Sequence, residues 1–456
     1  MKQQIPVEKN QDYTIEIIDQ GHEGQGVGKI EGFTVFVEGA IAGETVEVRI
    51  IKVEKNFAYG KLLRIIKEAD SRIIPECPVF KRCGGCQLQH MSYEAQLSFK
   101  TKLVRETIQR IGGLENVKVY DAIGMKEPWN YRNKAQYPVG TIDNNIIFGF
   151  YANRSHEIIE GQDCIIQDAK SYEIAKHAAL YFQEHKIPAY DEKTGKGLVR
   201  HVMVRTGFKT GKIMLVIVTN AYNFPESQAF CEYIKSKFPE IKSIVQNINK
   251  RNTNVVLGDS SKILMGSDHI LDKIGEYTFK ISPLSFFQVN PIQTEVLYEK
   301  AVEYAGLTGK ETVFDLYSGI GTISLFLSAK AKKVYGIEVV MPAVKDAIEN
   351  ANFNNIKNTE FICGEVEKVV PELYSKGVKA DVVVLDPPRK GCESVLIDTV
   401  AAMGPKRIVY VSCNPSTLAR DLKVFAEKGY VAKEIQPVDM FPQTHHVETV
   451  TLIELK

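Results

Sequence analysis

The sequence has no long hydrophobic run, and this absence limits where the protein can work. No stretch approaches the roughly 18 consecutive apolar residues of a membrane-spanning helix. Residues 1–11 are polar and do not resemble a signal peptide. Hydrophobic residues make up 44% and charged residues 25% of the chain, which is the composition of a globular protein. We therefore expect a cytoplasmic protein without a membrane partner.

The chain also has almost no net charge. Lysine and arginine number 57 and aspartate and glutamate 56, which leaves a formal charge of +1. This balance argues against a nucleic-acid binder that uses its whole surface. Basic residues are nevertheless concentrated between Arg49 and Lys67 and between Lys193 and Lys212. Such clusters neutralise phosphates, although a solvated lysine face has the same composition.

With 456 residues the chain is too long for one ordinary core, so we expect two or three domains. Residues 1–66 contain short stretches that alternate polar and apolar residues and are separated by glycines. This pattern predicts an OB-like β-barrel, an architecture that commonly binds nucleic acid. Residues 67–280 mix strand and helix patterns and are predicted to form an α+β central domain.

Residues 281–456 are predicted to form an α/β domain. From Glu311 onward, hydrophobic strands alternate with helical stretches, a rhythm typical of a doubly wound, mainly parallel sheet. The predicted strands are Thr312–Leu316, Val334–Ile337, Phe361–Cys363, Asp381–Leu385 and Arg407–Val411. In such sheets the ligand binds beyond the carboxyl ends of the strands.

A glycine motif stands at that position after the first of these strands. Residues 315–322 read Asp-Leu-Tyr-Ser-Gly-Ile-Gly-Thr, and glycines there let a ligand approach the helix N-terminus. An NAD site is disfavoured because Ser324 replaces the third glycine of the dinucleotide fingerprint. Glu338 ends the second strand, where a carboxylate can accept hydrogen bonds from both ribose hydroxyls. The combination resembles a class I (Rossmann-like) methyltransferase that uses S-adenosylmethionine (AdoMet), and a turn without a ligand is the alternative.

Three further segments are predicted to reach the same face, namely residues 386–389 (Asp-Pro-Pro-Arg), 412–415 (Ser-Cys-Asn-Pro) and 445–448 (His-His-Val-Glu). They suit methylation of uracil at C5, a carbon too weakly nucleophilic to attack a sulfonium methyl group unaided. A thiolate that adds to C6 places electron density on C5, and a base must then remove the C5 hydrogen.

Cys413 is the best candidate for that nucleophile and Glu448 for that base. A free thiol has a pKa of about 8.5, and we expect Arg389 and backbone amides to lower it. Asp386 is placed to contact the uracil ring or the cofactor. Taken singly, a cysteine such as Cys413 is more commonly a buried core thiol, and an Asp-Pro-Pro-Arg segment is a tight turn.

Together these motifs, with Ser285-Phe-Phe-Gln-Val-Asn290, resemble the RNA uracil-5-methyltransferase family that contains the TrmA and RumA enzymes. The resemblance covers nearly the whole chain. It implies that Cys413 is the nucleophile, that Glu448 is the proton acceptor and that Phe286 stacks near the target RNA. It also implies a set of residues that contact AdoMet, namely Gln288, Tyr317, Glu338, Asp386, Thr322 and Glu365. Of these, Thr322 and Glu365 stand where some members of the family carry asparagine.

Four of the eight cysteines predict a metal site rather than disulfides, which a reducing cytosol disfavours. Cys77, Cys83, Cys86 and the distant Cys164 suit zinc or an iron–sulfur cluster, since both use four thiolates, and spacing alone does not decide. The RumA branch of the family carries a four-iron cluster on this pattern. The resemblance therefore implies a [4Fe–4S] cluster, a TRAM-type N-terminal barrel and 23S rRNA as the substrate.

Residues 129–134 interleave aromatic and basic side chains. Aromatic rings there can stack on RNA bases while Arg132 and Lys134 meet phosphates, although a packed Trp/Tyr pair with surface cations gives the same pattern.

Rival functions remain. One is the same chemistry on tRNA, and another is an iron–sulfur RNA-binding protein without catalysis. A radical methylthiotransferase would need a Cys-x3-Cys-x2-Cys motif, which is absent, and a cytosine-5 methyltransferase would place a Pro-Cys pair where this chain has Pro387 and Pro388. We expect a monomer that needs no protein partner.

Overall fold

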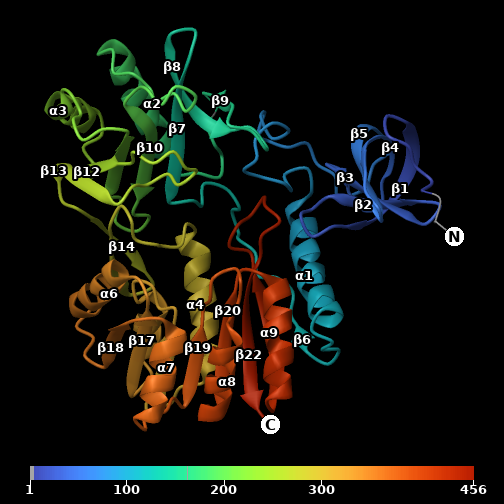
Figure 1. The fold of residues 1–456 in the computed structure, drawn as a ribbon, viewed down its shortest axis with the longest axis vertical. Coiled ribbons are helices and arrows are strands. Elements are labelled where there is room, and N and C mark those ends of the chain that lie inside the picture. The colour runs from blue at the N-terminus through green and yellow to red at the C-terminus, as the bar shows by residue number, and fades with distance from the viewer. Residues whose placement is uncertain (1–4, 162) are drawn as a thin grey trace.

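The computed structural model describes residues 5–161 and 163–456. Its strands form a closed barrel, a seven-stranded sheet, a two-stranded hairpin and an eight-stranded sheet (Figure 1). Among the described residues, no helix combines the length and the hydrophobicity that a membrane crossing requires.

The N-terminal strands form a closed five-stranded barrel, as the alternating pattern predicts. Strand β1 pairs with both β2 and β4, which closes the ring in the order β1-β2-β3-β5-β4. Every second side chain points inward, and Val35, Val37, Val46 and Val48 are fully buried. The strands are β1 (Asp12–Gln20), β2 (Gly26–Ile30), β3 (Phe33–Glu38), β4 (Thr45–Val53) and β5 (Phe57–Lys67).

The central part of the chain forms a seven-stranded sheet in the order β13-β12-β11-β10-β7-β8-β9. Helices α2 (Ala169–Glu184) and α3 (Ser227–Lys237) pack on one face, and a hairpin and helix α4 (Pro291–Ala305) lie against the other. Strands β10 and β11 are therefore buried at every position. The strands are β7 (Lys134–Ile142), β8 (Asn145–Tyr151), β9 (Ile158–Glu160), β10 (Val199–Thr206), β11 (Ile213–Thr219), β12 (Ile241–Ile248) and β13 (Ser260–Gly266), and the hairpin is β14 (Ile270–Ile274) and β15 (Tyr277–Ile281).

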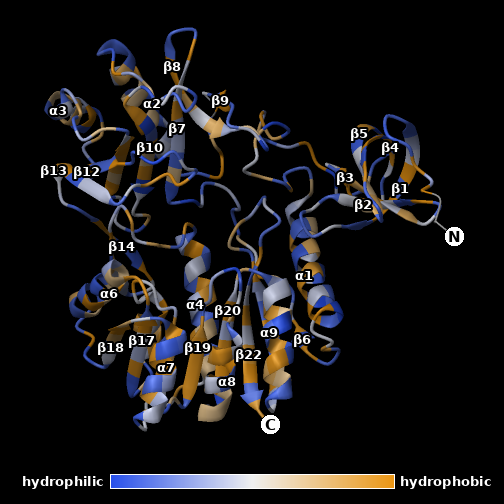
Figure 2. Cartoon of the chain, in the orientation of Figure 1, coloured by the Kyte–Doolittle hydropathy of each residue, from blue (hydrophilic) through white to orange (hydrophobic). Residues whose placement is uncertain are grey.

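The C-terminal part is the predicted doubly wound α/β layer structure. The sheet order is β18-β17-β16-β19-β20-β22-β21-β6, with β16 to β20 parallel and β22 antiparallel to β20. Its strands are largely hydrophobic in Figure 2 because helices cover both faces. The strands are β16 (Thr312–Leu316), β17 (Lys333–Glu338), β18 (Thr359–Cys363), β19 (Val382–Leu385), β20 (Arg407–Ser412), β21 (Tyr430–Val438) and β22 (Glu448–Leu455).

Six helices accompany these strands in two layers. Helices α4, α5 and α6 contribute to one core, and α7, α8 and α9 contribute to the other. The helices are α4 (Pro291–Ala305), α5 (Thr322–Ser328), α6 (Met341–Phe353), α7 (Val366–Ser375), α8 (Ser394–Met403) and α9 (Pro415–Glu427).

Helix α1 (Tyr93–Arg110) and strand β6 (Lys118–Val119) also belong to these layers, although they stand far earlier in the chain. Val104 and Ile108 of α1 are buried in the same core as α8 and α9, and β6 extends the sheet by pairing with β21. The domain limits 1–66, 67–280 and 281–456 remain a prediction. Helix α1 and strand β6 fall inside the predicted central domain, but they pack on the C-terminal sheet.

Candidate active site

The turn after β16 has the backbone shape of a ligand-binding loop. Tyr317, Gly319 and Gly321 all have positive φ angles, of 65°, 55° and 79°. Positive φ is rare for a tyrosine, and such conformations concentrate at functional sites. At Gly321 a Cβ atom would lie 2.8 Å from the Phe361 ring, so only glycine fits. The chain thus passes from this turn directly into α5, and the backbone N–H groups of the turn lie at the edge of the sheet.

Glu338 ties this turn to the end of β17. Its Oε2 accepts a hydrogen bond from the Gly319 amide at 3.1 Å, and its Oε1 accepts one from the Val340 amide at 2.8 Å. Each carboxylate oxygen retains a further lone pair. The acid is therefore held in a fixed position with acceptor capacity left for ribose hydroxyls.

Three adjacent strands bring Asp386, Cys413 and Glu448 to the same edge of the sheet. Asp386 follows β19, Cys413 follows β20, and Glu448 begins β22. Because β22 runs antiparallel to β20, its first residue lies at the carboxyl end of β20. Ser412 pairs with Thr449, so Cys413 and Glu448 stand opposite one another at the next position.

The electrostatics of this cluster are dominated by burial. Glu448 is 5% exposed, and burial together with the Asp386 charge raises its pKa well above the ordinary value. Burial raises the pKa of Asp386 to about 7. The Arg389 charge lowers the pKa of Glu448, but it does not outweigh burial.

The Cys413 thiol differs from the sequence-based expectation. Arg389 and a backbone hydrogen bond act to lower its pKa, as expected, but they are the smaller effects. Burial, followed by the charges of Glu448 and Asp386, raises the pKa of Cys413 to about 11. The prediction of a lowered pKa was therefore wrong for the free protein, because sequence spacing does not report desolvation.

The residues after Cys413 hold the Asp386–Arg389 segment in place. The Asn414 side chain caps α9 by accepting from the Ser416 amide at 3.0 Å, and its Nδ2 donates to the Arg389 carbonyl at 3.2 Å. The Thr417 hydroxyl donates to the same carbonyl at 3.3 Å. A helix cap thus ties the Ser412–Pro415 segment to the Asp386–Arg389 segment.

The loop before Glu448, residues 439–447, is anchored by helix α1. Asp439 forms an ion pair with Lys100, and both side chains are fully buried. The Tyr93 hydroxyl donates to the same carboxylate at 2.9 Å. Gln96 donates to the Gln443 side chain and accepts from the Gln443 amide, both at 3.0 Å. Sequence reasoning missed this anchor, because neither Lys100 nor Asp439 belongs to a recognisable motif.

Comparison with known proteins identifies the family. The family model "tRNA (Uracil-5-)-methyltransferase" matches residues 232–456, and the TRAM domain model matches residues 6–63. A protein of Clostridium tetani named an uncharacterized RNA methyltransferase is 53% identical over 453 residues, covering 99% of this chain and 98% of the relative. A Bacillus cereus protein of the same name is 52% identical over 448 residues, covering 98% and 97%.

The chain belongs to the RNA uracil-5-methyltransferase family. A solved structure supports this assignment across the molecule: the Pyrococcus abyssi tRNA (uracil-54, C5)-methyltransferase in complex with S-adenosyl-L-homocysteine. It is 28% identical, with a TM-score of 0.77, and the match covers 97% of this chain and 100% of that one. The protein is thus an AdoMet-dependent RNA methyltransferase with an RNA-binding TRAM barrel.

The remaining residues predicted to bind the cofactor differ in their exposure and in their hydrogen-bond partners. Gln288 is 9% exposed, and the Thr322 hydroxyl shares a 2.9 Å hydrogen bond with the Tyr298 hydroxyl. Glu365 instead forms an exposed ion pair with Lys368 at 2.7 Å. The Tyr317 hydroxyl donates to Glu367 at 2.9 Å, a contact that the sequence did not suggest.

The four predicted metal ligands of the methyltransferase line one pocket of about 230 Å³. Burial raises the pKa of Cys86 to about 12 and that of Cys164 to about 11, and neighbouring cysteines add to both shifts. Within residues 5–161 and 163–456, no group of three or more Cys, His, Asp or Glu side chains is arranged to hold a metal ion. The structure therefore gathers the four thiols around one space without forming a metal-ion site.

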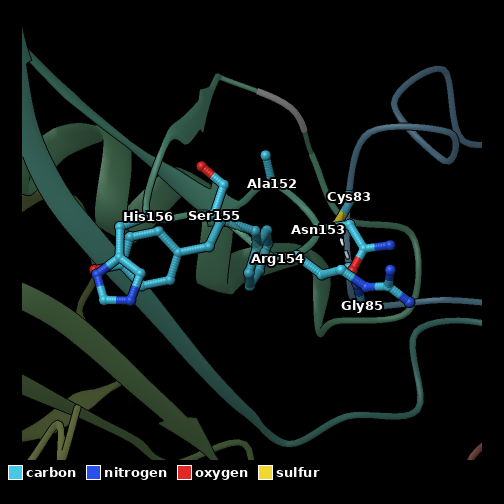
Figure 3. A pocket seen from close by; sticks show the side chains of 10 residues that line it. Cys83, Gly85, Ala152, Asn153, Arg154, Ser155 and His156 are labelled. Carbon is cyan, nitrogen blue, oxygen red and sulfur yellow. Dashed lines mark hydrogen bonds between the residues drawn. The ribbon is translucent and has the colours of Figure 1, made fainter. Parts of the chain in front are cut away.

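An open pocket of about 560 Å³ adjoins this cysteine pocket, and the two share Cys83, Gly85 and Phe150. In its wall the rings of Tyr151 and His156 stack with centroids 5.1 Å apart. Figure 3 shows His156 together with Ala152, Asn153, Arg154 and Ser155 of the same wall. The loop after β8 closes onto the cysteine segment, since the Asn153 amide donates to the Arg82 carbonyl at 2.8 Å. The cysteine pocket is thus bordered on its Cys83 side by space open to solvent.

Proposed function

We propose that this methyltransferase transfers a methyl group to C5 of a uridine in 23S rRNA through a covalent adduct between Cys413 and C6 of the base. The observation that carries the mechanism is the placement of Glu448 opposite Cys413 by the antiparallel strand β22, with Asp386 on the neighbouring strand end. A nucleophile, a base and a ring-contacting carboxylate then share one edge of the sheet.

The reaction follows from the chemistry of these groups. Cys413 and Glu448 each first lose a proton to solvent, because burial raises the pKa of both groups in the free protein. The Cys413 thiolate then forms a bond to C6, and the electrons of the C5–C6 double bond move to C5. When bound, AdoMet supplies the methyl group that C5 accepts. Glu448 as carboxylate then takes the hydrogen from C5, the C5–C6 double bond re-forms, and the bond between the Cys413 sulfur and C6 breaks. Asp386 orients the uracil ring, and the Arg389 cation favours the ionised forms of Cys413 and Glu448.

The cofactor is assigned to the edge formed by the β16 turn and the ends of β17 and β19. Glu338 receives the ribose hydroxyls, and Gln288, Tyr317 and Asp386 contact the remainder. Thr322 and Glu365 complete the set. Support is strongest for Glu338, whose two oxygens are fixed by backbone amides, and weakest for Glu365, whose carboxylate is engaged by Lys368.

We also propose a [4Fe–4S] cluster held by Cys77, Cys83, Cys86 and Cys164. The donor set fits, because four thiols and no other metal ligand of comparable softness line the pocket. A cluster carries each thiolate on a separate iron, so its ligands stand farther apart than four ligands on one zinc ion. The four thiols share one pocket, which is the arrangement that a cluster requires. Anaerobic purification followed by iron, sulfide and zinc analysis tests this, and one zinc per chain without sulfide would refute it.

The 23S rRNA assignment rests on the resemblance that joins the cysteine set to the TRAM barrel. The second candidate substrate is tRNA, which the Pyrococcus abyssi structure favours because its name specifies tRNA and its chain matches this one throughout. Arg132, Lys134 and Phe286 are assigned to RNA contact with either substrate, and the enzyme acts as a monomer in this proposal.

One experiment separates these possibilities. Purified protein and a Cys413→Ala variant are incubated with labelled AdoMet and either a 23S rRNA transcript or total tRNA, and 5-methyluridine is mapped. Methylated 23S rRNA with wild type and none with the variant is the expected result. Methylation of tRNA alone would keep the mechanism and replace the substrate. Binding of RNA without methyl transfer to either RNA would favour a non-catalytic role.

A further inference from the structure

Two cations stand directly opposite one another in the central sheet. Lys134, the first residue of β7, pairs in register with Arg205 near the end of β10. Directly opposed side chains on antiparallel strands have Cβ atoms about 5 Å apart, and like charges in that arrangement are destabilising. A like-charge pair at this position needs a reason.

No carboxylate compensates this pair among the described residues that affect its protonation. Burial lowers the pKa of Arg205 to about 10. Burial, Arg205 and Arg132 together lower the pKa of Lys134 to about 8. Buried cations in proteins are normally paired with an anion, because desolvation of an unpaired charge costs several kcal/mol. Lys134 is half-buried and Arg205 is buried, and within the described residues neither forms an ion pair with a carboxylate.

Arg205 also holds the segment that carries Phe286. The Arg205 side chain is 4% exposed, and its Nη2 donates to the carbonyls of Pro283 at 3.2 Å and Ser285 at 2.8 Å. Its Nε is buried without a hydrogen-bond partner in the part of the chain that the structure describes. Arg205 therefore keeps one buried donor without a partner among the described residues beside this segment, and a phosphate reaches it only from the Lys134 side of the pair.

The neighbouring residue of β7 fixes the other end of the same segment. The Asn133 side chain donates to the Gln288 carbonyl at 3.0 Å, and the Asn133 amide donates to the Val289 carbonyl at 2.8 Å. Between these two anchors Phe286 is 70% exposed, which is unusual for a phenylalanine on a segment so firmly held. An exposed ring and an uncompensated pair of cations thus lie against one rigid segment.

We propose that Lys134 and Arg205 form a binding site for one backbone phosphate of the RNA, next to the nucleotide that stacks on Phe286. This inference rests on the proposed function in taking RNA as the ligand and in assigning a stacked nucleotide to Phe286. The phosphate supplies the anion that the pair lacks, and its position fixes the register of the strand relative to the stacking ring. Arg205 acts in addition as a positioning residue, because it sets the backbone on which Phe286 stands.

The test replaces single phosphates by neutral groups. Short oligoribonucleotides are cut from the RNA that wild type methylates, and each carries one methylphosphonate linkage at a different position near the target uridine. Their dissociation constants are measured by fluorescence anisotropy for wild type, Lys134→Met and Lys176→Met. Lys176 is a matched control on α2 of the same domain, 48% exposed in its side chain.

A methylphosphonate at one particular linkage is expected to raise the dissociation constant of the RNA for wild type by about 10-fold. Lys134→Met is expected to raise the dissociation constant of the unmodified RNA by a similar factor. That same linkage should then cost the Lys134→Met variant less than about 2-fold, whereas Lys176→Met should retain the full wild-type loss. Lys134→Arg, which keeps the charge, should restore the coupling. Equal losses in wild type and Lys134→Met at every linkage would overturn the proposal.

The role of Arg205 is read from kcat and KM. Arg205→Met is expected to lower kcat as well as raise KM, because the Phe286 segment loses its anchor, and Arg205→Lys should recover part of both. A change in KM alone would mean that Arg205 contributes its charge to RNA binding but does not position Phe286. If wild type methylates no RNA, the proposed function fails, and the same linkage series is then measured with oligouridylate. If methylation is normal and no linkage couples to Lys134, only the phosphate site fails.

Discussion

At the scale of single residues, burial raises the pKa of Cys413, the proposed nucleophile, so we expect its thiol to be protonated in the free enzyme at neutral pH. Its pKa is raised to about 11, and only the ionised form is nucleophilic. Alkylation of Cys413 by iodoacetamide should therefore be slow at pH 7 and should rise with pH until about pH 11. Mass spectrometry of the Cys413 peptide follows the rate without interference from the other cysteines.

The Arg389→Ala variant provides the matched control. Removal of a cation that favours the thiolate should move the alkylation profile to still higher pH. A wild-type rate that reaches its plateau below pH 8 would show that the free thiol is already ionised, and it would contradict the dominance of burial at this site.

Glu448→Gln isolates the last step of the proposed mechanism. Glutamine keeps the shape of the side chain but cannot take the C5 hydrogen, so the methylated adduct should accumulate and turnover should fall by about 10²- to 10⁴-fold. The adduct is expected as a protein–RNA band that survives a denaturing gel and disappears when Cys413 is also replaced. Undiminished turnover would assign the proton transfer to another group.

At the scale of elements, the loop 439–447 depends on helix α1. Lys100→Met leaves the Asp439 carboxylate buried without its cation, which should lower the free energy of unfolding by about 3–5 kcal/mol. Urea unfolding measures the loss. The double variant Lys100→Met/Asp439→Asn removes both charges and should recover most of the stability. A double variant as unstable as the single one would mean that packing of Lys100, rather than its charge, anchors the loop.

The sequence predicted the elements better than their long-range pairings. The barrel follows from period-two alternation, and β16 to β20 follow from hydrophobic strands separated by helical stretches, because both signals are local. The antiparallel insertion of β22 beside β20 and the pairing of β6 with β21 have no local signal.

In the candidate site, too, the sequence predicts local features but not long-range contacts. Cys413, Asp386 and Glu448 stand at strand ends, which a strand prediction locates, whereas their mutual distances depend on register. Lys100, Asp439 and Arg205 gain their roles from partners more than 70 positions away, and no spacing rule identifies them.

At the scale of the whole molecule, the cysteine segment is tied to the loop 439–447 that precedes Glu448. The amides of Gln87 and Leu88, which directly follow Cys86, both donate to the Gln443 carbonyl at 3.0 Å. If the four cysteines hold a cluster, its loss should loosen residues 439–447. Cys86→Ser is then expected to weaken RNA binding and lower methyl transfer while AdoMet binding, measured by calorimetry, stays within about 2-fold.

The Cys231→Ser variant is the control, because that buried thiol lies in the central core away from the four-cysteine pocket. Unchanged RNA binding and turnover in Cys86→Ser would separate the cysteine segment from catalysis. An equal loss in Cys231→Ser would point to general destabilisation instead.

The packing of α1 and β6 on the C-terminal sheet also bears on how the protein is made. Tyr93 reaches its partner Asp439 across 346 positions of sequence, and Lys118 pairs with Glu434. A ribosome that adds about 5–20 residues per second needs roughly 15–70 s to span that interval. During this time the apolar side of α1 has neither α9 nor β21 to cover it, whereas the strands of the barrel are complete at residue 67 and those of the central sheet at residue 266. Nascent chains of this methyltransferase should therefore engage chaperones through the segment 93–119, and translation speed over the second half of the message should influence its yield.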